Sequence, residues 1–111
     1  LACMSFVSAF AGQTMRVGQN DEITFETRVK VGQNLLLPGT YRFAHVIESE
    51  HHIIILTPTS AENAGQGIRV QCKLESTGSP AKYTELHFAP GEQVKTLHYV
   101  LVAGESARHR F

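Results

Sequence analysis

Histidine is the only residue type with metal-binding or acid–base chemistry that this sequence holds in excess. The 111 residues include six histidines and two cysteines, Cys3 and Cys72. Neutral imidazole and thiolate are ligands that copper and zinc prefer in proteins. The candidate metal ligands are His45, His51, His52 and Cys72. The remaining histidines are His87, His98 and His109.

The spacing of these candidates narrows the set without defining a site. His45 and Cys72 each fall on the apolar phase of an alternating segment. His51 and His52 are adjacent, so in a strand they point to opposite faces and at most one of them joins His45. No His-x-His or His-x-x-x-His pair occurs, and a single inward histidine is commonly a core residue hydrogen-bonded to the backbone. A copper or zinc site and a satisfied core histidine beside a packed thiol both remain open.

Motifs for catalysis are scarce. Aspartate occurs once, at Asp21, which excludes an Asp-rich calcium loop and disfavours a Ser-His-Asp triad, although glutamate could substitute. The sequence has no Gly-x-Ser-x-Gly elbow, no phosphate-binding loop and no Cys-x-x-Cys pair. We therefore expect a non-catalytic domain with a binding or structural role. A metal-binding module is the first alternative, and a small hydrolase or isomerase is the second.

Length and charge limit the remaining classes. A chain of 111 residues has room for one domain. Ten basic and ten acidic residues give a formal net charge of zero, and the Lys and Arg residues are scattered. A nucleic-acid partner is therefore not expected. No apolar run approaches the roughly 20 residues of a transmembrane helix, so no such segment is expected.

Alternation of apolar and polar residues predicts the elements that must position the histidines. Strands are expected at residues 23–31, 41–47, 51–56, 68–74, 84–88, 94–102 and 107–111, separated by Gly- and Pro-containing turns. No segment shows a helical period. This pattern predicts an all-β fold, an antiparallel β-sandwich or small barrel of about six to eight strands. The expected core residues are Phe25, Val29, Tyr41, Phe43, Ile54, Val70, Leu74, Leu86 and Phe88.

Two segments suggest further features. Residues 53–56 are apolar on both faces of their strand, so a second layer or a partner chain must cover the outer face, and self-association is one expected outcome. Residues 57–67 form one long polar loop, of a length that is often functional but is most simply a hairpin connection.

The first eleven residues (LACMSFVSAFA) differ from the rest, because they are uncharged and almost wholly apolar or small. They end in Ala9-Phe10-Ala11, the small-x-small pattern that a signal peptidase recognises. We expect residues 1–11 to be the end of a signal peptide and residues 12–111 to be a single exported β-domain, periplasmic or extracellular. An ordinary N-terminal core segment and a lipoprotein anchored at Cys3 are the alternatives.

Residues 31–41 (VGQNLLLPGTY) resemble the VG-x-x-x-L-x-PGTY signature of small exported bacterial β-domain proteins of unknown function. In those families, a strand ends in Val-Gly and a short loop leads to the Pro-Gly-Thr-Tyr that opens the next strand. The resemblance, which runs from Val31 to Tyr41, implies a compact β-sandwich-like domain outside the cytoplasm. It implies nothing about activity.

Cleavage after Ala11 is the first testable prediction. The mature chain should begin at Gly12 and should keep Cys72 as its only thiol, since Cys3 is removed with the leader. N-terminal sequencing of exported material measures this directly. Recovery of a cytoplasmic protein that retains residues 1–11 would contradict both the export and the single-thiol expectation.

Overall fold

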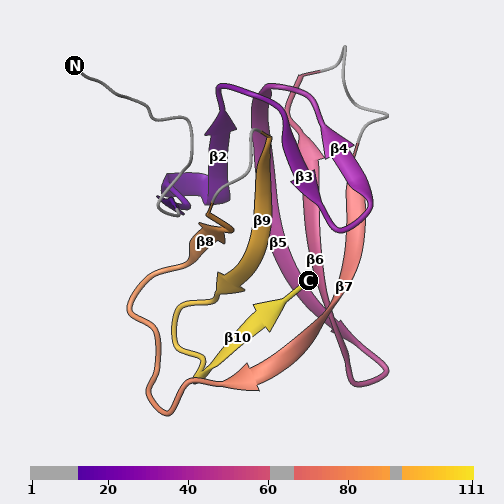
Figure 1. Ribbon diagram of the computed structural model, residues 1–111. Helices are drawn as coiled ribbons and strands as arrows, with labels where there is room; N and C mark the ends of the chain where they lie inside the picture. The colour runs from indigo at the N-terminus through magenta and orange to yellow at the C-terminus, as the bar shows by residue number, and fades with distance from the viewer. Residues whose placement is uncertain (1–12, 61–66, 91–93) are drawn as a thin grey trace, which may run out of the picture.

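The computed structural model describes residues 13–60, 67–90 and 94–111. The described residues form strands and turns, with one 3-10 turn, η2 (Gln19–Asp21), and no α-helix among them (Figure 1). The predicted all-β class is confirmed. The strands are β1 (Thr14–Arg16), β2 (Glu22–Phe25), β3 (Val29–Val31), β4 (Asn34–Leu36), β5 (Gly39–Glu48), β6 (His51–Pro58), β7 (Ile68–Ser76), β8 (Glu85–Phe88), β9 (Lys95–Leu101) and β10 (Ala107–Arg110).

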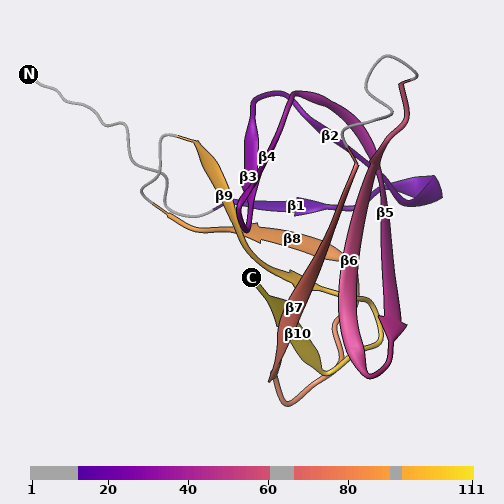
Figure 2. The same ribbon diagram turned by 90° about the vertical axis from the view of Figure 1, so that its right-hand side faces the viewer.

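Eight of these strands curl into a nearly closed antiparallel barrel (Figure 2). Their order around it is β1-β8-β9-β10-β7-β6-β5-β2. The short hairpin β3–β4 joins through β3, which pairs in parallel with β9. In both views the β5–β6 hairpin and the turn between β9 and β10 lie at one end, and β3–β4 lies at the other (Figures 1 and 2).

Strand β7 connects the two halves of the barrel. Its residues 68–72 pair with β6, and its residues 73–76 pair with β10. Cys72 is the last residue of the first set and lies opposite His52. Cys72 therefore lies where β7 changes its partner from β6 to β10, at the barrel end that carries the β5–β6 hairpin.

An aromatic cluster fills part of the core. The ring centroid of Phe25 lies 5.5 Å from that of Tyr41 and 6.5 Å from that of Phe88, the second pair edge to face. The buried Tyr41 hydroxyl donates a hydrogen bond of 2.7 Å to the Leu37 carbonyl oxygen, which satisfies its one polar group. Tyr41 thus begins the inward face of β5, as predicted.

Most of the predicted core is confirmed. The buried members are Phe25, Val29, Tyr41, Phe43, Ile54, Leu86 and Phe88, and Val70 packs partly buried against them. The prediction was wrong for Leu74, whose side chain is 47% exposed. Leu74 has the inward phase of β7, but it lies beyond Cys72, where β7 no longer pairs with β6 and one side of Leu74 loses its neighbouring strand.

Two predicted strand assignments differ from the structure. The alternation over residues 23–31 continues through a corner at residues 26–28, where the chain passes from β2, paired with β5, to β3, paired with β9. Residues 34–36, expected in a loop, form β4. Leu97 and Val100 are both buried although they are three residues apart, because the register of β9 against β8 shifts at His98. A bulge of this kind hides the inward phase from sequence inspection.

Some of the apolar residues of β6 lie on its outer face. Ile54 and Leu56 are buried inside the barrel, whereas Ile53 and Ile55 face outward and are half-buried. Self-association through this face stays a prediction. The expected signal peptide and most of the 57–67 loop lie outside the described residues. In the described part of the chain, no helix has the length and apolar character needed to cross a membrane.

Replacing Phe43 by alanine should destabilise the domain by ~3–5 kcal/mol, because a large buried ring is lost and a cavity remains. Chemical denaturation measures the free energy of unfolding. The matched control is Ile47→Ala, which changes an exposed residue of the same phase on the same strand and should cost no more than ~0.5 kcal/mol. Equal losses for the two variants would contradict the assigned packing of β5.

Candidate metal centre

The β5–β6 hairpin brings two histidines together inside the barrel. His45 lies opposite Ile54, and His52 lies opposite Ile47, so both histidines share the inward face as diagonal neighbours. The Nε2 atom of His45 is 2.9 Å from Nδ1 of His52, and the two rings are stacked with centroids 5.1 Å apart. Strand pairing alone thus fixes one half of the site.

The turn between β9 and β10 supplies the other half. Gly104 has a φ of 88°, a conformation that favours glycine, and it directs the chain back toward the barrel. The Glu105 backbone is held on both sides, because its N–H donates to the Val102 carbonyl and its carbonyl accepts from Ala81 N–H. Four residues later, His109 points inward from β10 and is completely buried.

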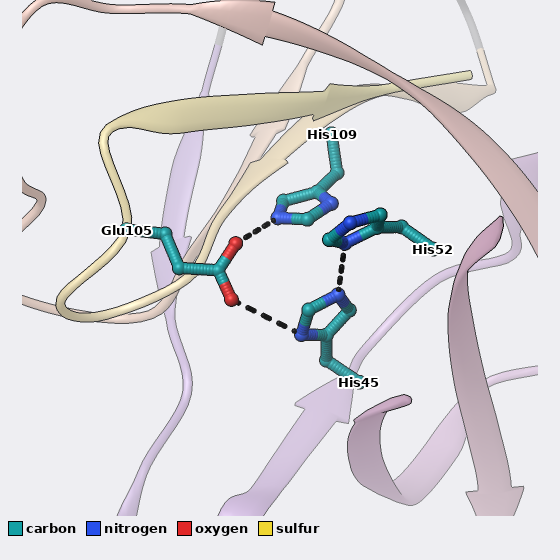
Figure 3. Close-up of side chains that lie close together, drawn as sticks. All are labelled: His45, His52, Glu105 and His109. Atoms are coloured by element: carbon teal, nitrogen blue, oxygen red, sulfur yellow. Dashed lines mark hydrogen bonds and ion pairs between the residues drawn. The ribbon is translucent and has the colours of Figure 1, made fainter. Parts of the chain in front are cut away.

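The Glu105 carboxylate joins the two halves (Figure 3). Its Oε1 lies 2.9 Å from His109 Nε2, and its Oε2 lies 3.4 Å from His45 Nδ1. One ligand atom from each of His45, His52, Glu105 and His109 lies within 4.8 Å of the other three. The side chains of His109, His45 and Glu105 are 0%, 10% and 33% exposed, so solvent reaches the site from the carboxylate side. We call these four residues the His/Glu cluster.

The hydrogen bonds of the His/Glu cluster are consistent with neutral histidines. A proton on Nε2 of His109 and a proton on Nδ1 of His45 both face the carboxylate. The Nε2 atom of His45 is then an acceptor for His52 Nδ1–H. Burial lowers the pKa of His45 and of His109, and it outweighs the opposing attraction of Glu105. Neutral imidazole is the form that binds a metal.

Cys72 lies beside the His/Glu cluster. Its Sγ donates to the His52 carbonyl oxygen at 3.3 Å and is 3.4 Å from His109 Nδ1. The sequence Cys72–His109–Glu105 therefore has the connectivity of a nucleophile, a base and an orienting carboxylate. Burial, however, raises the pKa of the Cys72 thiol to about 11. A buried, protonated thiol is a poor nucleophile and a poor metal ligand.

Of the four ligand candidates expected from the sequence, two come together in the structure and two do not. His45 and His52 both belong to the His/Glu cluster. His51 points outward and is exposed, with its Nδ1 2.9 Å from Gln71 Nε2, as the opposite-face argument requires. Cys72 contacts His109 but is not one of the four converging residues.

Glu105 and His109 complete the cluster and were not among the expected ligands. Their i, i+4 spacing suggests one face of a helix, whereas the chain forms a turn followed by a strand. A strand of four residues, such as β10, is too short for alternation to reveal which of its side chains point inward. Only the closure of the barrel, which brings β10 next to β7, places these two residues near His45.

The two remaining histidines lie elsewhere. His87 lies on the outer face of β8, stacked on Tyr99 with centroids 4.5 Å apart and in contact with Thr14 and Glu85. His98 is exposed at the β9 bulge.

Comparison of the chain with protein-family models, with curated proteins and with solved structures found no match. The resemblance of residues 31–41 to exported bacterial domains therefore stays a prediction.

The lowered pKa values of His45 and His109 predict that metal-free protein loses stability in mild acid. With folded-state pKa values below the usual 6.5, the unfolded chain takes up protons first as the pH falls. The contribution of the two neutral histidines to the free energy of unfolding is complete above pH 6.5. It is lost as the pH falls from 6.5 through the lower pKa values of the folded state. Denaturation of chelator-treated protein between pH 7.5 and 5 measures this loss.

The variant His45→Gln should show a shallower decline over the same range, because one of the two depressed groups is removed. A free energy of unfolding that is constant or rises as the pH falls from 7.5 to 5 would contradict the assignment of neutral, buried histidines.

Proposed function

We propose that this protein is a non-catalytic β-domain that binds a divalent transition metal, zinc or copper, through His45, His52, Glu105 and His109. The observation that supports this most directly is the convergence of four potential ligand atoms within 4.8 Å of one another, contributed by three strands and a fixed turn. The site sits at one end of the small barrel.

The donor set favours zinc or copper(II) over other biological cations. Three neutral imidazoles and one carboxylate are typical ligands of these ions, whereas calcium and magnesium prefer oxygen atoms alone. Ligand bonds of about 2.0–2.2 Å to such a metal place neighbouring ligand atoms roughly 3–3.6 Å apart. The four side chains need only small rotations to reach that spacing. The protonated thiol of Cys72 weakens the case for a soft thiolate site.

A metal-free hydrogen-bonded network is the competing explanation. In the metal-free structure, no buried polar side-chain nitrogen or oxygen of the described residues lacks a hydrogen-bond partner. Even so, taking a carboxylate and three imidazoles out of water costs free energy that apolar side chains of similar size would not incur. Among the described residues, the apolar core holds 14 buried residues, so a polar cluster of this size is a substantial departure. Such local violations of good packing are expected at functional sites.

The proposal excludes a nucleophilic role for Cys72 and keeps the domain non-catalytic. An exported location is also part of the proposal and depends on the cleavage expected after Ala11.

Thermal unfolding with and without metal tests the proposed function. A ligand that binds only the folded state, at a hundredfold excess over its dissociation constant, stabilises it by ~2.7 kcal/mol. For a domain of about 100 residues this raises Tm by roughly 10 °C. The comparison uses chelator-treated protein, zinc and copper(II) at neutral pH, with the thiol reduced.

Two ligand variants and one matched control make the test specific. His45→Gln and Glu105→Gln keep side-chain shape and should lose most of the metal-dependent shift. His51→Gln changes the neighbouring, outward-facing histidine and should keep it. A wild-type protein whose Tm is unchanged by either metal, or a shift lost equally in His51→Gln, would contradict a metal site at the His/Glu cluster.

A further inference from the structure

Two large apolar side chains stand exposed beside the His/Glu cluster. Ile47 is 59% exposed and Leu74 is 47% exposed. Ile47 lies directly opposite His52 across the β5–β6 pair, and Leu74 lies directly opposite His109 across the β7–β10 pair. Residues directly opposite in an antiparallel pair share a face, with Cβ atoms about 5 Å apart. Both apolar side chains therefore share the inward face of the barrel with the histidines they adjoin.

Their exposure has a positional cause. In β5 and β7, the inward phase passes through buried residues, Phe43 and Cys72, before it reaches Ile47 and Leu74. The two exposed side chains therefore lie toward the barrel end that carries the β5–β6 hairpin, level with His52 and His109. Solvent also reaches Glu105, one third of whose side chain is exposed. A ligand that binds at this end contacts both the exposed apolar side chains and the His/Glu cluster.

The charge of the metal-loaded His/Glu cluster determines which class of ligand it favours. A divalent metal held by one carboxylate and three neutral imidazoles leaves a local charge of +1. In a partly buried site, a single negative charge on an added ligand neutralises this excess at little cost.

We propose that the metal centre takes a monoanionic organic ligand, a carboxylate with a short apolar chain, whose carboxylate binds the metal while its chain packs between Ile47 and Leu74. This inference rests on the proposed function, since the metal supplies the charge that attracts the anion. It adds a ligand class that the four protein ligands alone do not define.

Copper(II)-loaded protein provides the test, because its visible absorption responds to a change of ligands. Acetate and hexanoate are titrated separately and the band shift is followed. Each methylene fully removed from water contributes ~0.8 kcal/mol, or about fourfold in affinity. Hexanoate, with four more methylenes than acetate, should bind at least tenfold more tightly.

The variants Ile47→Ser and Leu74→Ser should each weaken hexanoate binding at least threefold and leave acetate binding unchanged. Both positions are exposed, so the fold should persist, and Tm in chelator verifies it. The matched control is Leu35→Ser, an exposed leucine on β4 at the other end of the barrel (Figure 1), which should affect neither ligand.

The outcomes separate the two proposals. Equal affinity for acetate and hexanoate, or loaded protein whose spectrum responds to neither, overturns the apolar anion site and leaves the metal centre intact. Protein that fails to retain copper overturns both.

Discussion

The polar end of this barrel depends on the contacts that the Glu105 carboxylate makes with two histidines. One oxygen contacts His109 on β10 and the other faces His45 on β5, so a single side chain connects two strands that do not pair with each other. The carboxylate can do this because Ala81 and Val102 hold the Glu105 backbone in place. Without the oxygen atoms of this carboxylate, the ring N–H groups of His109 and His45 would lose their acceptor, at a cost of about 1–3 kcal/mol for each unsatisfied buried group.

The barrel divides its interior between two kinds of chemistry. The apolar part, built around Phe25, Tyr41 and Phe88, supplies the hydrophobic stabilisation that a domain of this size requires. The polar part lies where β7 changes partners at Cys72, and its inward histidines adjoin the buried Val100 and the exposed Ile47 and Leu74. A small core can hold a polar cluster at its end, since solvent there lowers the cost of desolvation that a central position would impose.

The sequence predicts the part of this arrangement that depends on local periodicity. Alternation identified the all-β class, the inward phase of Tyr41 and Phe43, and the opposite orientations of His51 and His52. Alternation failed where tertiary structure intervenes. The corner at residues 26–28, the bulge at His98 and the exposure of Leu74 all follow from how the sheet curves and where it ends. Glu105 and His109 reach His45 only through closure of the barrel, which no local pattern encodes.

Cys72 shows how one buried cluster can serve a metal-free and a metal-bound state. In the metal-free protein, His109 directs its Nε2 proton to Glu105, and its Nδ1 faces the sulfur of Cys72 at 3.4 Å. A metal that takes Nε2 requires the ring proton to move to Nδ1. The Nδ1 proton then faces the sulfur of Cys72, a weak acceptor, while the S–H of Cys72 still donates to the His52 carbonyl oxygen. A contact to the ring nitrogen that does not bind the metal orients a metal-binding histidine. The buried thiol therefore suits the site better as a neutral partner of His109 than as a ligand.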